Sequence, residues 1–381
     1  MGVVQRSMTA VGTVLLAAGL AAAATGLLPA GDLRELIART APVLAFVAAI
    51  SVVAELADRA GVFAMFVHRA EQLGRGRVWL LWLVFAALAV VSTVFLSLDT
   101  TAVLLTPVVV LTARRLGLDP LPFAITTVWL ANTGSLLLPV SNLTNLLAHQ
   151  RLDSPTPGGF AALTWRPAVV AILVPMAIIA LVFLRTLRRR YRSVIPEETT
   201  DPRRRRWSCG VLLLLLPALV SGLPPWIPAT VAAIVLGLIA LVREDRRCLR
   251  PSLVPWPLLV FAAGLFVAME SLLKAFPADR IDAIEVSSPL AVASLGAVAA
   301  NLVNNLPAYL ALEPIAADPR SLIALLVGVN AGPLVTPWAS LATLLWHQRL
   351  EAAGVRVPWI RFVSLGAVAC LLTVPLAAWA V

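Results

Sequence analysis

One carboxylate interrupts a long apolar run in this sequence. Asp99 lies near the middle of residues 78–115, a segment with basic residues at both ends, and Thr100 and Thr101 follow it directly. A carboxylate at membrane depth is costly and marks a functional site by default. Asp99 can carry a coupling proton, and the neighbouring hydroxyls can bind a polar solute. The structural alternative is that Asp99 only caps the helix that follows it.

Neutral polar side chains form two further clusters, within residues 119–150 and 321–350. Each segment is roughly 30 residues long, too long for one straight membrane span, and each holds glycine and proline at its middle. An unwound helix frees backbone groups and presents partial charges, which suits a hydroxylated or carboxylated solute. The alternative is that small polar residues only let helices pack closely. The clusters contain Asn132, Thr133, Ser135, Ser141, Asn142, Thr144 and Asn145, then Asn330, Thr336, Ser340 and Thr343.

The two broken segments are copies of one pattern. At a constant offset Asn132 aligns with Asn330 and Pro139 with Pro337, and both segments close on the tetrapeptide HQRL. An internal repeat of this length indicates one architecture used twice. We interpret the repeated histidines as residues of a water interface at a helix end. A role as proton relays is the alternative.

Two glutamates occupy matching places in a second aligned pair of segments. Glu55 has Arg59 four residues on, and Glu270 has Lys274 at the same spacing. This spacing predicts an ion pair within each helix, near a span end where long side chains reach water. We therefore interpret both glutamates as structural.

The composition is that of an integral membrane protein. Of 381 residues, 60% are hydrophobic and 13% are charged, and the formal net charge is +10. Soluble proteins are about a quarter charged. The arginines lie in short loops between apolar runs, as the positive-inside rule expects, so nucleic acid is excluded as a partner. The three cysteines are widely spaced, and we expect neither a disulfide framework nor a metal site, and no cofactor.

The basic loops predict a topology in the cell (inner) membrane. Residues 59–77, 185–207 and 243–250 are predicted to be cytoplasmic, which places the N-terminus in the cytoplasm and the C-terminus outside. Residues 8–28 are long enough to span the bilayer, so we predict a retained span in preference to a cleaved signal peptide.

Two apolar segments are predicted to be re-entrant helical hairpins, since polar tips at membrane depth need shelter. Residues 78–115 turn at Asp99-Thr100-Thr101, and residues 286–318 turn at Asn304-Asn305. An odd number of spans separates them, which inverts the second repeat. The predicted fold is thus all-α, polytopic and inverted-repeat, with two hairpins and two broken helices. Its predicted divisions are 1–40, an N-terminal span and loop; 41–192, the first repeat; 193–253, an Arg-rich loop and connecting spans; and 254–381, the second repeat.

Four stretches resemble a known family. SLDTTAVLLTP, ANTGSLLLPVSNLTNLL, NNLPAYL and GPLVTPWASLATLLW are similar to the arsenite/antimonite efflux permeases of the ion transporter superfamily. The resemblance covers residues 41–381 and is most specific over 330–346. It implies scaffold and transport domains, with hairpins and broken helices in the moving part, and elevator-like alternating access. It also implies proton-coupled export of arsenite or antimonite as neutral trihydroxides, with an optional cytoplasmic ATPase.

The chain departs from the family pattern at two sites. Many members carry Asn-Asp-Gly at the first tip, where this chain has Leu98-Asp99-Thr100. Many carry Asp-Thr in the first break, where this chain has Asn132-Thr133. No cysteine lies in a motif, so arsenite would be held through oxygen contacts.

The leading hypothesis is a secondary transporter that exports arsenite or antimonite in exchange for protons. An anion (dicarboxylate-like) or sodium/proton carrier of the same superfamily is the alternative, and a channel subunit energised by a soluble ATPase is an alternative of another class. An enzyme is not expected, because His149 and His347 have no nucleophile or metal-ligand companions. The expected partners are the inorganic solute, protons, the lipid bilayer, an optional ATPase subunit and, in a homodimer, a second copy of the chain.

Overall fold

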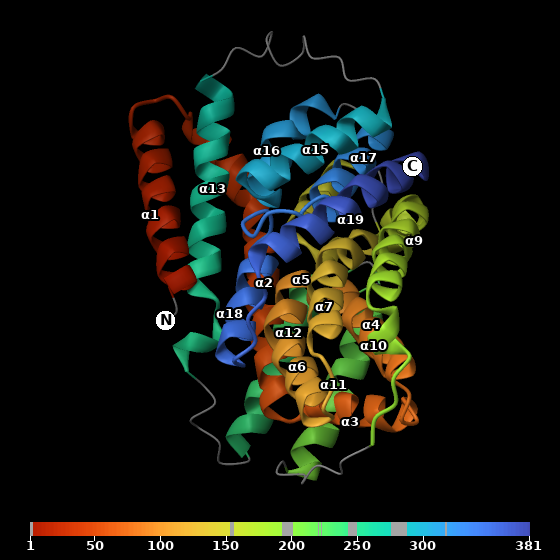
Figure 1. The fold of residues 1–381 in the computed structure, drawn as a ribbon. Helices are drawn as coiled ribbons and strands as arrows, with labels where there is room; N and C mark the ends of the chain where they lie inside the picture. The colour runs from red at the N-terminus through yellow and green to blue at the C-terminus, as the bar shows by residue number, and fades with distance from the viewer. Residues whose placement is uncertain are drawn as a thin grey trace.

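The computed structural model describes most of the chain as helix (Figure 1). The described parts are residues 3–152, 156–192, 201–219, 221, 223–242, 250–275, 288–316 and 318–381. Within them the only extended pairing is an isolated bridge between Arg77 and Arg190. Among the described residues, four helices are long and apolar enough to cross a membrane: α2 (Ala30–Arg59), α4 (Val78–Leu96), α9 (Pro157–Val182) and α19 (Trp359–Trp379). The predicted class, a polytopic all-α membrane protein, is confirmed.

The second helix begins earlier than predicted. Helix α1 (Val3–Ala24) is followed closely by α2, which starts at Ala30, so the predicted loop up to residue 40 is wrong. Pro29 directly precedes the helix, and Asp32 lies in its first turn, where the helix dipole favours a carboxylate. Pro42 is accommodated inside α2. Polar and charged residues that suggested a loop therefore form the exposed first turns of a long helix.

Five helices form a connected set that we call the outer group. It consists of α1, α2, α11 (Pro202–Leu219), α12 (Trp226–Val242) and α13 (Trp256–Ala275). Helix α1 packs along α13 (Figure 1), α2 contacts both α12 and α13, and α11 contacts α12. The backbones of α1 and α13 approach most closely at two glycines. A Cβ atom on Gly264 would lie 2.3 Å from the carbonyl oxygen of Gly12, so a larger residue there would force the helices apart.

Only one of the two predicted ion pairs within helices is present. Arg59 Nη2 lies 2.8 Å from Glu55 Oε1, as the spacing predicted. Lys274 Nζ instead lies 2.9 Å from Asp32 Oδ2, so it joins α13 to α2. Glu270 still interacts electrostatically with Lys274, but the close ion pair is made by an acid on the neighbouring helix that is distant in sequence.

Two helical hairpins enter the molecule from opposite ends (Figure 1). The first rises from the lower end, beside α3 (Val62–Leu73), and comprises α4, α5 (Leu98–Thr100), the π-helical turn η1 (Thr101–Leu105) and α6 (Thr106–Arg115). The second descends from the upper end and comprises α15 (Pro289–Val303) and α16 (Asn305–Leu312), followed by the short turn η6 (Glu313–Ile315). The predicted pair of hairpins is therefore present, with opposite orientation.

The hairpins turn at residues in the same unusual backbone conformation. Ser97 has φ 103° and ψ 157°, and Asn304 has φ 117° and ψ 154°. These angles are strained for a residue with a side chain and persist only where the surroundings enforce them. The second turn lies where it was predicted, but the first lies two residues before Asp99. Ser97 was overlooked because a positive φ is normally expected at glycine.

Two helices are broken near their middles, at the glycines and prolines that predicted the breaks. The first consists of α7 (Leu121–Thr133), the short 3-10 turns η2 (Gly134–Leu137) and η3 (Pro139–Ser141), and α8 (Leu143–Arg151). The second consists of α17 (Pro319–Ala331) and α18 (Leu341–Ala352), with a non-helical segment between them. Proline removes a backbone donor and crowds the preceding turn, which explains why α17 ends just before Pro333, whereas Pro139 begins the turn η3 inside the first break.

Each hairpin packs against halves of both broken helices. In the first, η1 contacts α7 and α18, while α16 of the second contacts α17 and α8. Trp346 of α18 illustrates this interleaving: it is fully buried, and its indole N–H donates to the carbonyl oxygen of Ala124 in α7 at 2.9 Å. Neither repeat could therefore complete its core alone.

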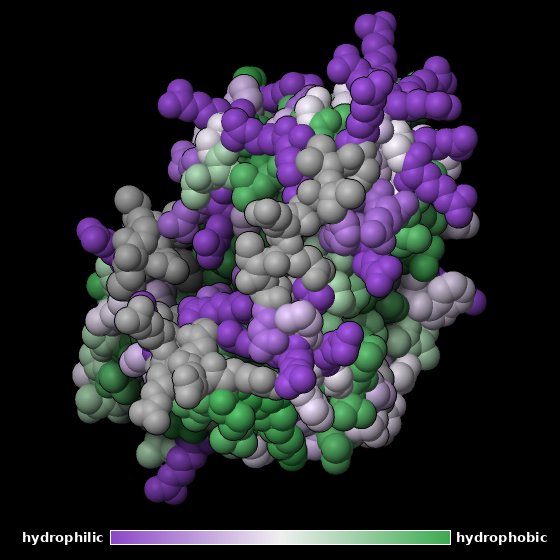
Figure 2. Space-filling model, turned by 90° about the horizontal axis from the view of Figure 1, so that it is seen from below, coloured by the Kyte–Doolittle hydropathy of each residue, from purple (hydrophilic) through white to green (hydrophobic). Residues whose placement is uncertain are grey.

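The lower end of the molecule is rich in arginine. Figure 2 looks at this end, where hydrophilic side chains project over the face and apolar residues lie at its margin. Arginines at the base of the first hairpin, after α10 (Leu184–Leu187) and in the first turn of α11 contribute to it. By the positive-inside rule, this end is the one that we predict to face the cytoplasm.

Candidate substrate and coupling site

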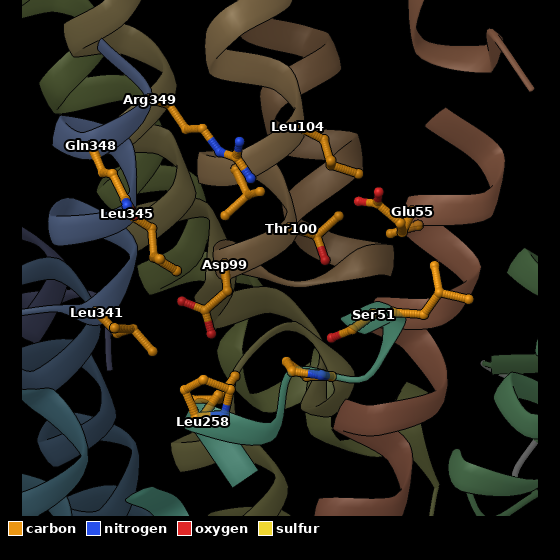
Figure 3. Close-up of a pocket in the computed structure, with 15 residues that line it drawn as sticks. Ser51, Glu55, Asp99, Thr100, Leu104, Leu258, Leu341, Leu345, Gln348 and Arg349 are labelled. Atoms are coloured by element: carbon orange, nitrogen blue, oxygen red, sulfur yellow. The ribbon is translucent and has the colours of Figure 1, made fainter. Parts of the chain in front are cut away.

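A cavity of about 180 Å³, which we call the lower cavity, separates the outer group from the first hairpin. Its walls come from α2, the start of α13, the first hairpin and α18 (Figure 3). The polar residues that line it are Ser51, Glu55, Asp99, Thr100, Gln348 and Arg349. The second HQRL sequence thus supplies two of the polar lining residues, beyond the boundary role that the sequence suggested.

Asp99 directs its carboxylate into the lower cavity (Figure 3). Its Oδ1 atom is buried, and no hydrogen-bond partner reaches it within the described part of the chain. The helix cap is provided by another residue, because Ser97 Oγ accepts a hydrogen bond from the amide of Thr100 at 3.3 Å. Serine is a preferred capping residue, a signal that the sequence carried. The capping alternative for Asp99 is therefore wrong, and its carboxylate remains available.

The two threonines after Asp99 have different surroundings. Thr100 lines the lower cavity, and its hydroxyl lies 3.1 Å from that of Ser97. Thr101 is fully buried; its hydroxyl donates to Ser92 Oγ at 2.9 Å and accepts from Thr93 Oγ1 at 3.0 Å. A hydroxyl network thus fixes the returning limb of the hairpin to α4. Only Thr100 of this pair faces the cavity.

The two hairpin tips meet beside the first helix break. A small pocket of about 20 Å³ is lined by Asp99, Asn142, Asn304 and Asn305, together with apolar residues of α13 and α18. Three of the sequence elements predicted to build a site therefore converge here. The Asp99 carboxyl and the three amide side chains thus line one pocket together.

The second hairpin tip is anchored to the second helix break. Asn304 Nδ2 donates to the carbonyl oxygen of Trp338 at 2.8 Å. The backbone N–H of Asn305 donates to the carbonyl oxygen of Ala339 at 2.9 Å. Asn301 adds to this anchor: its Oδ1 accepts from the amide of Thr336 at 3.0 Å. The hydroxyl of Thr336 donates back to the carbonyl oxygen of Asn301 at 2.8 Å. Asn301 was not among the predicted site residues, because its sequence shows only an amide within the apolar descending limb.

A buried cluster of amides joins the two broken helices to each other. Asn330 Oδ1 accepts from Asn142 Nδ2 at 2.6 Å and from Thr144 Oγ1 at 3.1 Å. Asn330 Nδ2 donates to Asn145 Oδ1 at 2.7 Å. Asn145 Nδ2 in turn donates to the carbonyl oxygens of Ser135 and Leu138, at 2.6 and 3.1 Å. In this conformation Asn330 binds protein groups, so a solute could contact it only if the cluster opened.

The remaining predicted residues are buried in the two breaks. Asn132 Nδ2 donates to Val128 O at 2.9 Å, while its Oδ1 has no partner among the described residues. Ser135 Oγ donates to Asn132 O at 2.6 Å, and Ser141 Oγ donates to the carbonyl oxygen of Val94 in the first hairpin at 2.9 Å. The other three lie nearby without lining the cavities described above. Ser340 caps α18, and the hydroxyls of Thr133 and Thr343 are buried without a described partner.

We expect Asn330→Ala to destabilise the protein more than Asn132→Ala. The first change removes three side-chain hydrogen bonds and strands buried partners, each at roughly 1–3 kcal/mol. The second removes one bond, made within its own helix. Thermal unfolding in detergent, followed by fluorescence of the intrinsic tryptophans, measures the difference. Equal melting temperatures for the two variants would show that the amide cluster contributes little to joining the helices.

Three charged residues, which we call the upper cluster, close the opposite end of the interface with the outer group. Arg39 Nη2 of α2 lies 2.6 Å from Glu313 Oε1, next to the second hairpin, and the Arg151 guanidinium lies 3.9 Å from the same oxygen. Arg151 also donates to the carbonyl oxygen of Glu313 at 2.9 Å, and Gln150 donates to that of Arg39 at 3.1 Å. The first HQRL sequence therefore contacts the outer group, whereas the second borders an open cavity.

Oppositely inserted hairpins, two broken helices and a cavity lined by a buried carboxylate are typical of a secondary transporter, and the family match assigns the chain to the ion transporter superfamily. A family model described as a citrate transporter (CitMHS) matches residues 1–343, so the chain belongs to that family. The chain is also similar to individual proteins of this kind and is a multi-pass membrane protein.

The chain is 28% identical over 363 residues to the arsenical pump membrane protein of Escherichia coli (strain K12), covering 86% of this chain and 82% of that one. The arsenical pump membrane protein of Yersinia enterocolitica is 27% identical over 376 residues, covering 86% of each chain. The crystal structure of the YdaH transporter from Alcanivorax borkumensis matches with a TM-score of 0.53 and 15% identity, covering 99% of this chain and 97% of that one. The last comparison supports the fold alone.

Proposed function

We propose that this protein exports arsenite or antimonite as neutral trihydroxides in exchange for protons. The observation that carries the proposal is the Asp99 carboxylate, which lies in the wall of the lower cavity without a described partner for Oδ1. Relatives that bear the name arsenical pump membrane protein share most of the chain's length. Neutral hydroxyl and amide groups around the carboxylate suit a trihydroxide, which both donates and accepts hydrogen bonds.

In the proposed cycle the solute enters the lower cavity from the cytoplasm. The outer group serves as the scaffold, and the hairpins and broken helices of residues 41–192 and 254–381 serve as the moving part. The upper cluster closes the far side while the lower cavity is open. Movement of the hairpins past α2 and α13 would then break the upper contacts and carry the solute outward, in an elevator-like step.

A proton exchanger needs a group that is protonated in one half of this cycle. The low dielectric around Asp99 favours the neutral acid, whereas the helix N-terminus that begins at Leu98 favours the anion. Because these two effects oppose each other, a small change in the surroundings can alter the protonation state of Asp99. Binding of the solute beside Asp99 is such a change.

Uptake into everted membrane vesicles tests the function. An acidic vesicle interior should drive accumulation of arsenite or antimonite, because export from the cell corresponds to entry into an everted vesicle. Vesicles without the protein serve as the control. Absence of uptake for both solutes would overturn the proposal, and uptake that required ATP and no gradient would favour a channel with an ATPase partner.

Citrate or a related carboxylate is the second candidate substrate. The family description names citrate, and Arg349 supplies a cation in the wall of the lower cavity that could bind a carboxylate. The same vesicles decide between the candidates, since citrate uptake in competition with arsenite would place both in one site, and citrate uptake alone would replace the metalloid.

A further inference from the structure

A second, larger cavity borders the first hairpin next to α3 and α11. Its volume is about 330 Å³, within the range of ligand pockets, and its walls are α3, α4 and α11. Phe63, Phe95 and Leu216 are typical of its lining, and Ser92 is the one hydroxyl-bearing residue in it. It shares no lining residue with the lower cavity. The two cavities are therefore distinct, and the larger one needs a ligand of its own.

The residues around this apolar cavity indicate that it opens toward the bilayer. Phe66, Val91 and Leu213 line it and also have large exposed fractions, 44%, 50% and 69%. An apolar cavity does not hold ordered water, because water needs polar partners. In a membrane the molecules that can reach it are lipids, and a hydrocarbon chain matches its walls.

Positive charge lies below the cavity on one of the helices that form it. Residues Cys209, Leu213 and Leu216 share a face of α11, and Arg205 and Arg206 precede Cys209 by four and three residues, which places them on the same face. Arg205 is close enough to Cys209 for an electrostatic interaction. Trp207 is 64% exposed beside them, as is common for tryptophan at a membrane–water interface.

We propose that this cavity binds one acyl chain of an anionic phospholipid, with the lipid phosphate held by Arg205 and Arg206. The spacing along α11 supports this arrangement, because the arginines lie about one helical turn before Cys209. A single lipid can therefore place its headgroup at the arginines and its acyl chain among the leucines of the cavity. Guanidinium groups bind phosphate through paired hydrogen bonds, and their positive charge favours a lipid with a net negative charge over a zwitterionic lipid, whose choline is also cationic.

The bound chain would contact the back of the first hairpin tip. Ser92 lines the cavity and also accepts the hydrogen bond from Thr101, two residues after Asp99. Lipid in the cavity would therefore support the wall that holds the tip network in place. This link is a consequence of the proposed site, and its test does not depend on which solute the protein transports.

Native mass spectrometry of the purified protein tests the site, with phosphatidylglycerol and phosphatidylcholine of identical acyl chains as probes. The wild-type protein should retain phosphatidylglycerol preferentially. Leu212→Trp, which fills part of the cavity, should reduce retention of both lipids. Its matched control is Leu214→Trp, since Leu214 is 75% exposed on the same helix and does not line the cavity.

A charge variant separates headgroup binding from chain binding. Arg205→Gln with Arg206→Gln should keep chain binding but lower the preference for phosphatidylglycerol by about thirtyfold, given the usual effect of two charges at a membrane surface. The control is Arg188→Gln with Arg189→Gln, a charge-matched pair after α10. An equal loss of the preference for phosphatidylglycerol in the control pair would overturn the proposal. Unchanged lipid retention by a Leu212→Trp variant whose melting temperature equals that of the wild type would also overturn it.

Discussion

Asp99→Asn is expected to abolish solute accumulation driven by a pH gradient, while the protein still inserts and binds solute. Asparagine preserves the shape and the hydrogen-bonding reach of the side chain but cannot gain or lose a proton at neutral pH. With a gradient of one pH unit, a one-proton exchanger accumulates a neutral solute about tenfold, because that gradient is worth about 1.4 kcal/mol. The variant should therefore show no accumulation above the level reached without a gradient, measured by uptake into everted vesicles.

Glu55→Gln is the matched control for Asp99→Asn. Glu55 lines the same cavity but is paired with Arg59, so its loss should leave gradient-driven accumulation in place. Binding of antimonite to both variants is measured in detergent, to separate coupling from binding. Full accumulation by Asp99→Asn would move the coupling group elsewhere, with Glu55, Glu270 and the two HQRL histidines as the next residues to test.

Glu313→Gln is expected to open the upper end of the transporter. The Glu313 side chain is 9% exposed and accepts hydrogen bonds from Tyr309 at 3.0 Å and from Arg39 at 2.6 Å. Neutralising it leaves Arg39 and Arg151 close together without the shared anion. Both arginines are about one-third exposed, so solvent screening limits the effect to roughly 1–2 kcal/mol. This corresponds to a five- to thirtyfold shift away from the conformation with a closed upper end.

A cysteine at Met269 can report this opening, because Met269 lines a small pocket beside the upper cluster. Its rate of labelling by a membrane-impermeant maleimide from the upper side should rise in Glu313→Gln. Asp318→Asn is the control. Asp318 lies at the same end but caps α17. Hydrogen bonds from the Ser321 hydroxyl and from backbone amides lower the pKa of its carboxyl. Similar labelling rates in all three proteins would mean that the upper cluster does not hold the interface closed.

The sequence predicted the elements of this protein better than it predicted the contacts between them. Glycine and proline at the centre of overlong apolar segments predicted both helix breaks, because those residues act locally on the backbone. The internal repeat and the arginine loops predicted two opposed hairpins. The capping role of Ser97 was missed because the serine occupies a backbone conformation usually left to glycine.

Contacts between distant parts of the chain could not be predicted in the same way. Arg39 and Glu313 are 274 residues apart, and nothing in either local sequence identifies the other as its partner. The repeat assigned Asn330 to the second helix break, and only the folded chain shows that its side chain is bound by Asn142, Thr144 and Asn145 of the first. The assignment of the predicted polar residues to solute binding stays a prediction.

The close packing of α1 on α13 has a consequence for how the protein is made. The glycines that allow it, Gly12 and Gly264, are separated by most of the chain, so α1 leaves the ribosome long before its partner exists. At about 5–20 residues per second, that interval is on the order of ten to fifty seconds. During it the newly inserted α1 must wait in lipid, with the face that will cover α13 still bare. Assembly of the outer group is therefore a late event of biogenesis, and a chaperone or insertase that shields α1 would act in that interval.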